Sequence, residues 1–169
     1  RDSPLYCLGG ISFLSFIILV MTGTVLGIYY VPGGEGIPSP AYLSMQYIMT
    51  ELPFGYIIRA VHHWGTHFMV ASVFLHMCRV YFTGAYRNPR ELNWLIGVAL
   101  MALTIVFGYS GYLLPWDSLA YGAAVIGINL ANSSPLVGKQ IATLLFGGSA
   151  LTPRTVTRIC LLYTSPSPR

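Results

Sequence analysis

Three long stretches of the sequence carry no charged side chain, and they limit the fold more than any other feature. They lie between residues 2 and 35, 59 and 79, and 91 and 117. A helix needs about 20 apolar residues to cross a hydrocarbon core about 30 Å thick. Only 8% of the residues are charged, against about 25% in a typical soluble domain. The sequence therefore predicts an all-α membrane protein with multiple transmembrane helices, at about 5–31, 53–82 and 92–116.

The remaining sequence is apolar but interrupted by asparagine, serine and proline. Two stretches, at about 118–130 and 136–147, are too short to cross a bilayer, and we expect them to be helices on the surface. Another helix is expected to begin at about residue 153. It is broken by a Pro- and Ser-rich end, so residues 1–160 are predicted to form one domain and 161–169 a non-native tail.

Charge and cysteine usage exclude several classes of protein. The net charge of +4 comes from scattered basic residues, so no basic stripe for nucleic acid is expected. The N-terminal residues lack the pattern of a signal peptide. The three cysteines are too far apart in sequence for a Cys-x-x-Cys metal pair or a disulfide framework: Cys7, Cys78 and Cys160.

The basic residues also predict an orientation. The connection between the second and third predicted spans holds Arg79, Arg87 and Arg90, whereas residues 32–52 hold no Lys or Arg. The positive-inside rule therefore places residues 79–92 and the N-terminus on the negative side of the membrane, and residues 32–52 and 117–153 on the positive side.

Two histidines in the second span are fourteen residues apart. On a helix, His62 and His76 lie within about 40° of the same face and about 21 Å apart along the axis. Ionisable groups inside a membrane are costly and usually functional, and imidazole is a common axial ligand of haem iron. Arg59 and Arg79 lie three residues outside His62 and His76, where the propionates of a haem would need a cation. The pattern therefore predicts two cofactors stacked across the bilayer.

Glycines repeat the same spacing in the neighbouring spans. Gly9 and Gly23 are fourteen apart, as are Gly97 and Gly111. In the predicted orientation, Gly23 and Gly111 match the depth of His62, and Gly9 and Gly97 match that of His76. Small residues at these depths would let a porphyrin approach closely, although glycine in membrane helices also serves helix packing.

Two other interpretations stay open at this point. His63 and His67 form an i, i+4 pair, which is the spacing of a helical metal site, but no carboxylate or third ligand accompanies them. The interrupted region 117–153 could instead belong to a transporter with discontinuous helices, which would be expected to have charges in the middle of the membrane.

Several segments resemble cytochrome b of the b6 type. The run Arg59–Trp94 resembles its second helix and the loop that follows, residues 46–55 resemble the approach to that helix, and Gly111–Asp117 resembles the end of its third helix. The resemblance implies a transmembrane four-helix bundle that holds two b-type haems. Helices A–C would be complete in this sequence and helix D truncated.

The resemblance also implies roles for individual residues. His62 would ligate the low-potential haem near the positive side and His76 the high-potential haem near the negative side. A quinol-oxidation pocket would include Tyr112, Tyr121 and Gly122. Cys7 would hold a further, c-type haem through one thioether. Without the resemblance, Cys7 reads as an inert residue at a helix end.

The resemblance further implies an oxidoreductase complex and its setting. One electron from quinol would pass to a Rieske iron–sulfur protein and the other across both haems to a quinone, with proton release on the positive side. Implied partners are a c-type cytochrome or cytochrome f, and a C-terminal cytochrome b subunit of the subunit IV type, in a dimeric complex. We expect a bacterial plasma membrane, with the thylakoid membrane as the alternative.

The sequence departs from the family near its end. Family members place two more histidines on the fourth helix, but none follows His76 here, and the first would fall at about Tyr163. A low-spin haem needs two axial ligands, and the sequence supplies one per site. The sequence thus predicts that these 169 residues alone insert into a membrane but hold neither b haem in its six-coordinate state.

Overall fold

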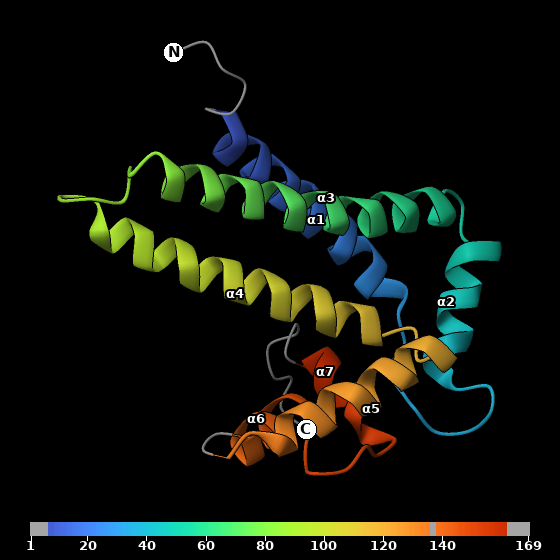
Figure 1. The fold of residues 1–169 in the computed structure, drawn as a ribbon. Helices are drawn as coiled ribbons and strands as arrows, with labels where there is room; N and C mark the ends of the chain where they lie inside the picture. Colours follow the sequence, from blue (N-terminus) through green and yellow to red (C-terminus); the bar gives the residue numbers. More distant parts are fainter. Residues whose placement is uncertain (1–6, 136–137, 162–169) are drawn as a thin grey trace. The chain divides into compact units, whose positions relative to one another are not determined.

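The computed structural model describes residues 7–135 and 138–161, and every regular element in this part of the chain is a helix (Figure 1). The helices are α1 (Leu8–Tyr29), α2 (Pro40–Thr50), α3 (Gly55–Phe82), α4 (Glu91–Leu113), α5 (Ser118–Ser133), α6 (Gly138–Leu145) and α7 (Arg154–Leu161). Apart from Leu161, the last residue of α7, the predicted tail 161–169 lies outside the described residues.

The chain divides into two compact units. One unit comprises residues 1–28 and 53–109, and so holds most of α1, all of α3 and most of α4. The other comprises residues 29–52 and 110–169, and holds α2, the last turn of α4 and the short helices α5 to α7.

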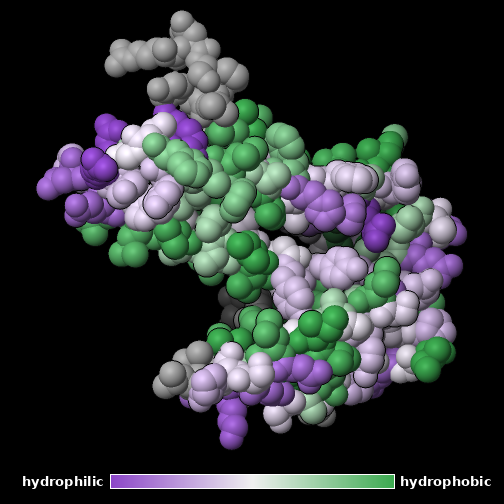
Figure 2. Space-filling view, viewed as in Figure 1, coloured by the Kyte–Doolittle hydropathy of each residue, from purple (hydrophilic) through white to green (hydrophobic). Residues whose placement is uncertain are grey.

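The first unit is built from long apolar helices. α1 and α4 are each long and apolar enough to cross a membrane. α3 is longer, at 28 residues, but its four histidines and two arginines lower its hydropathy. Large apolar side chains such as Phe13, Met21 and Leu95 are exposed, and Figure 2 shows hydrophobic residues gathered over this part of the chain. This is the arrangement that lipid-facing helices require.

Polar side chains in these helices bond to their own backbone. The hydroxyls of Ser12, Thr24 and Thr104 each donate to the carbonyl four residues earlier, at 2.7–2.9 Å. Such bonds satisfy a hydroxyl without water. Serine and threonine residues can therefore occur in apolar helices without leaving their hydroxyl groups unsatisfied.

The second unit contains most of the buried core. Along α5, Ala120, Ala124, Ile128 and Ala131 are buried, and their spacing places them on one helical face. Gly138 at the start of α6 approaches the carbonyl of Ala131 so closely that a Cβ atom would clash. The two stretches expected at 118–130 and 136–147 correspond to α5 and α6, which run over 118–133 and 138–145.

The helix α2 was not expected from the hydropathy pattern. It lies inside residues 32–52, which the sequence analysis treated as a connection. Ser39 caps it by accepting a hydrogen bond from the Tyr42 amide at 3.3 Å, and Pro40 occupies the first turn. A Ser-Pro pair is a known helix start, so the signal was present in the sequence.

The third span is shorter than expected. α4 ends at Leu113, whereas the apolar run continued to 116. Pro115 cannot continue a helix and disfavours helical geometry at the preceding residue. Asp117 then caps α5 by accepting a hydrogen bond from the Ala120 amide at 2.7 Å.

Candidate functional site

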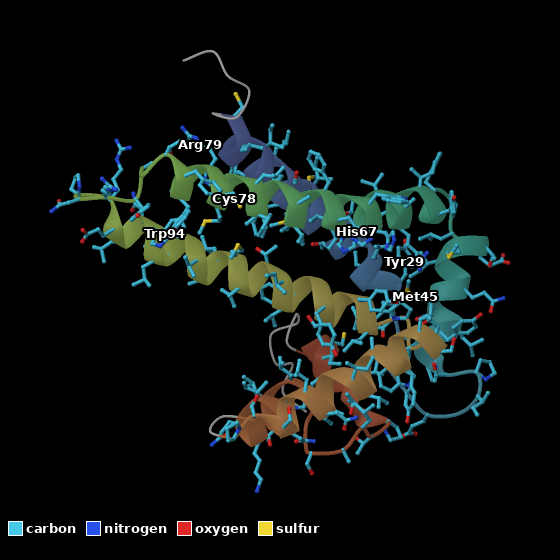
Figure 3. The ribbon with its side chains drawn as sticks, in the orientation of Figure 1. Tyr29, Met45, His67, Cys78, Arg79 and Trp94 are labelled. Atoms are coloured by element: carbon cyan, nitrogen blue, oxygen red, sulfur yellow. The ribbon has the colours of Figure 1, made fainter. Side chains whose placement is uncertain are left out.

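The histidines of α3 occupy two different environments. His62 and His76 are half-buried, whereas His63 and His67 are exposed. Figure 3 places His67 about half way along α3 and Arg79 near its end. The side chains of His62 and His76 both pack against α1, about 21 Å apart along the helix.

His62 lies directly against Gly23. A Cβ atom on this glycine would be 3.0 Å from Cε1 of His62, so a larger residue would displace the ring. The ring nitrogen Nδ1 lies 2.9 Å from Oγ1 of Thr22, whose hydroxyl lies 2.8 Å from the Ile18 carbonyl. If the hydroxyl donates to Ile18 and accepts from Nδ1–H, all three groups are satisfied. Nε2 is then left with a free lone pair.

His76 repeats this contact fourteen residues further along α3. A Cβ atom on Gly9 would lie 3.1 Å from Cε1 of His76. Its Nδ1 is buried and has no hydrogen-bond partner in the described part of the chain. A buried nitrogen left unpaired typically costs about 1–3 kcal/mol, and such atoms often mark a functional group.

These contacts determine the relative directions of the three long helices. Gly9 meets His76 and Gly23 meets His62, so α1 and α3 are antiparallel. α4 is antiparallel to α3 in turn, because Gly97 lies against Met77 and Gly108 against Thr66. A Cβ atom on Gly97 would lie 3.4 Å from the Met77 sulfur, so Gly97 faces the residue next to His76 rather than the imidazole itself. Gly111 is half-buried in the last turn of α4, in the other unit.

Arg59 and Arg79 are half-buried on the same helix as the two inner histidines. Each lies one helical turn from its histidine, towards the nearer end of α3. This places a cation beside each imidazole at the end of the helix, where a carboxylate ligand group could be bound.

The rival pair His63 and His67 forms an aromatic cluster with Trp64. The two imidazoles are 4.8 Å apart, and the Trp64 ring lies edge-on to both. In the described residues, no group of three or more His, Cys, Asp or Glu side chains is placed to bind a metal. His63 and His67 thus have no third protein ligand in that part of the chain.

The remaining candidate residues lie elsewhere. Cys7 is an exposed free thiol directly before α1, two residues from the glycine that touches His76. In the second unit, Tyr112 and Tyr121 are about half exposed, and Gly122 has open space where a side chain would be. The ring of Tyr121 meets that of Trp116 edge-on, with centroids 5.7 Å apart.

Long apolar helices with two imidazoles packed at separate depths are what a helical membrane protein that binds metal-centred cofactors would need. A family model described as Cytochrome b/b6/petB matches residues 3–165. The chain is 44% identical to cytochrome b6 of Heliobacterium modesticaldum over 158 residues, which is 94% of this chain and 72% of that protein. It is 45% identical to cytochrome b6 of Euglena gracilis over 159 residues, with the same coverage.

A solved structure is also similar. A chain of a hyperthermophilic respiratory complex III superposes with a TM-score of 0.82 at 33% identity, covering 96% of this chain. The present chain spans only 44% of the length of that chain. The protein belongs to the cytochrome b/b6 family. It is therefore an integral membrane protein of electron transport, and its family implies b-type haem as cofactor.

The glycine contacts lead to a prediction about haem retention. In the full-length protein, Gly23→Ala is expected to displace His62, and Gly9→Ala to displace His76. Overpacking of this kind typically costs about 1–3 kcal/mol, so each variant should weaken the binding of one b-type haem by about tenfold. Haem content and reduced-minus-oxidised spectra after purification in detergent measure this.

The same helix supplies matched controls. A Cβ atom on Gly10 or Gly27 would have no other group within 4 Å. Gly10→Ala and Gly27→Ala should therefore leave both haems in place. If the control variants lose as much haem as Gly9→Ala and Gly23→Ala, close packing on the imidazoles is not the reason for the glycines.

Proposed function

We propose that this chain is the di-haem cytochrome b subunit of a quinol-oxidising complex, in which electrons cross the membrane between two b-type haems. The observation that carries the proposal is the repeated packing of His62 and His76 against α1 glycines, fourteen residues apart on both helices. Such a repeat is what a protein would need in order to hold two similar groups at two depths.

The residues present fit two haems. His62 and His76 would each supply one ring nitrogen to a haem iron, and the Thr22 hydroxyl would fix the orientation of the His62 ring. Arg59 and Arg79 would neutralise propionates. Gly9 and Gly23 would give the two haem-binding imidazoles room, and Gly97 and Gly111 would leave room for the cofactor edges. When bound, b-type haem supplies reversible one-electron transfer.

The arginines support the assignment of the two sides. Arg87 and Arg90 are exposed in the connection between α3 and α4, and the connection from α1 to α2 has no Lys or Arg. The positive-inside rule then places His76 near the negative side and His62 near the positive side. By resemblance to the family, His62 would hold the low-potential haem and His76 the high-potential one.

Quinol oxidation would take place in the second unit, on the positive side. Tyr112, Tyr121 and Gly122 would line the pocket, with aromatic faces for the quinol ring and space at Gly122. The overall scheme is a Q cycle, in which quinol yields one electron to each of two routes and its protons leave on the positive side.

The proposed assembly follows the family. A Rieske iron–sulfur protein would take one electron and pass it to a c-type cytochrome or cytochrome f. A C-terminal cytochrome b subunit of the subunit IV type would complete the quinol site, and the complex would be dimeric. We place the complex in a bacterial plasma membrane, with the thylakoid membrane as the alternative.

We also propose that Cys7 carries a covalently attached c-type haem. Its thiol is exposed and free, which a thioether bond to haem requires. It lies two residues before Gly9, on the same side as His76. The extra haem would therefore lie on the negative side, near the high-potential b-type haem.

The proposed pocket can be tested at Tyr121. In the complete complex, Tyr121→Ala is expected to raise the KM for quinol by about tenfold, the effect of losing about 1.4 kcal/mol of ring contact. Both b-type haem spectra should stay unchanged. Steady-state turnover with a soluble quinol analogue measures the change.

Tyr47→Ala is the matched control, because this α2 tyrosine is 50% exposed and Tyr121 is 51% exposed. The control should keep the wild-type KM. An unchanged KM in Tyr121→Ala would place that residue outside the pocket. A wild-type complex that cannot reduce its b-type haems with quinol would overturn the proposed function itself.

A further inference from the structure

Trp116 adopts an unusual backbone conformation. Its φ is +50°, in the left-handed region that a bulky residue adopts only when its surroundings require it. Its amide donates to the Leu113 carbonyl at 3.2 Å, which closes the turn after α4. Contacts around Trp116, at the edge of the proposed quinol pocket, must therefore stabilise this backbone conformation.

The connection between α1 and α2 contacts this turn at two points. The Tyr30 hydroxyl donates to the Leu114 carbonyl at 2.6 Å. Further along, a Cβ atom on Gly34 would lie 3.1 Å from Nε1 of Trp116. The indole therefore rests on the bare backbone of Gly34.

Gly34 is held in place from the other side by the residue before α7. Its amide donates to the Pro153 carbonyl at 3.2 Å. A Cβ atom would lie only 2.9 Å from that carbonyl oxygen. Because Gly34 is enclosed by a backbone oxygen and by an indole, any side chain there must move one of them.

The indole of Trp116 also meets Tyr121, edge-on, with centroids 5.7 Å apart and planes at 87°. Gly34, Trp116 and Tyr121 therefore form a continuous line of contacts. All three belong to the same compact unit. The far end of this line is a residue of the proposed pocket, and the near end is a glycine outside it.

We propose that Gly34 is a positioning residue for quinol oxidation, because its lack of a side chain lets Trp116 rest against the α1–α2 connection and hold the ring of Tyr121. Tyr30 acts beside it by anchoring Leu114. Gly34 itself does not touch the substrate. The inference rests on the proposed function and adds a residue that sets the shape of the same pocket.

The test is a double-mutant cycle in the complete complex, with quinol turnover and haem spectra as readouts. Gly34→Ala is expected to raise the KM for quinol by about tenfold while kcat changes less than about twofold, and Trp116→Phe to raise it on its own. In the Trp116→Phe background, Gly34→Ala should change KM by less than about twofold, because the contact it disturbs is already lost. Gly148→Ala, where a Cβ has no other group within 4 Å, should match the wild type.

Each other result overturns a stated claim. An unchanged KM in Gly34→Ala, or effects of the two substitutions that multiply independently, would overturn the role of Gly34. If Gly34→Ala fails to assemble, Trp116→Phe decides, since it adds no bulk and removes the indole that rests on Gly34. A wild-type KM in Trp116→Phe would overturn the inference. Absence of quinol turnover in the wild-type complex would instead remove the proposed function, and this inference with it.

Discussion

Replacing His62 by alanine in the full-length protein should abolish one b-type haem, and replacing His76 should abolish the other. In the proposed arrangement each of these imidazoles supplies one nitrogen to a haem iron, and the methyl side chain of alanine cannot replace it. We expect the reduced-minus-oxidised spectrum of each variant to lose one component entirely and to keep the other. Haem-to-protein ratios of the purified variants should fall by one b-type haem in each case.

The exposed histidines of the same helix are the controls. His63→Ala and His67→Ala remove rings that contact each other and Trp64 but that do not touch the α1 glycines. Both variants should retain two b-type haems. Retention of both haems in His62→Ala or in His76→Ala would show that the axial ligands have been assigned to the wrong residues.

Cys7→Ser is expected to abolish covalent haem while leaving the b-type haems in place. A thioether survives denaturation, whereas axial coordination by histidine does not. The wild-type full-length polypeptide should therefore stain for haem on a denaturing gel, and the Cys7→Ser variant should give only background staining. Its b-type spectrum before denaturation should match the wild type.

Cys78→Ser provides the comparison for this experiment. Cys78 is also a free thiol, but it is half-buried on α3, so its loss should not change the staining. A wild-type band without haem stain would reduce Cys7 to a packing residue at the start of α1. Staining that persists in Cys7→Ser would assign the attachment to another residue.

The sequence spacing predicted which residues of α1 and α3 contact each other. Fourteen residues are close to four helical turns, so two glycines and two histidines with this spacing can meet pairwise when their helices are antiparallel. The structure places Gly9 on His76 and Gly23 on His62, the pairs that the predicted depths had matched. The same argument was less accurate for Gly97, which meets Met77, because spacing specifies depth but not the rotation of a third helix.

Other features depended on local or tertiary detail that a hydropathy pattern does not contain. The helix α2 is short, at 11 residues, and it was missed although Ser39 and Pro40 mark its start. The contact of Gly34 with Trp116 and Pro153 joins three connections that are far apart in sequence. No periodicity predicts such a contact, because it arises only once the second unit has folded.

The prediction of function from the sequence rested on two sources, residue spacing and resemblance to a family. Spacing alone predicted two cofactors held by imidazoles, and it could not say which reaction they serve. The roles of Tyr112, Tyr121 and Cys7 came from resemblance to the family. The structure adds the surroundings of these residues, such as the edge-on contact between Trp116 and Tyr121.

The central claim is that His62 and His76 hold two b-type haems at two depths of one membrane protein. A redox titration of the purified full-length complex, followed at the absorbance of reduced b-type haem, tests this most directly. We predict two one-electron transitions with separate midpoint potentials, of which His62→Ala removes the lower and His76→Ala the higher. A single transition in the wild type, or none, would contradict the account.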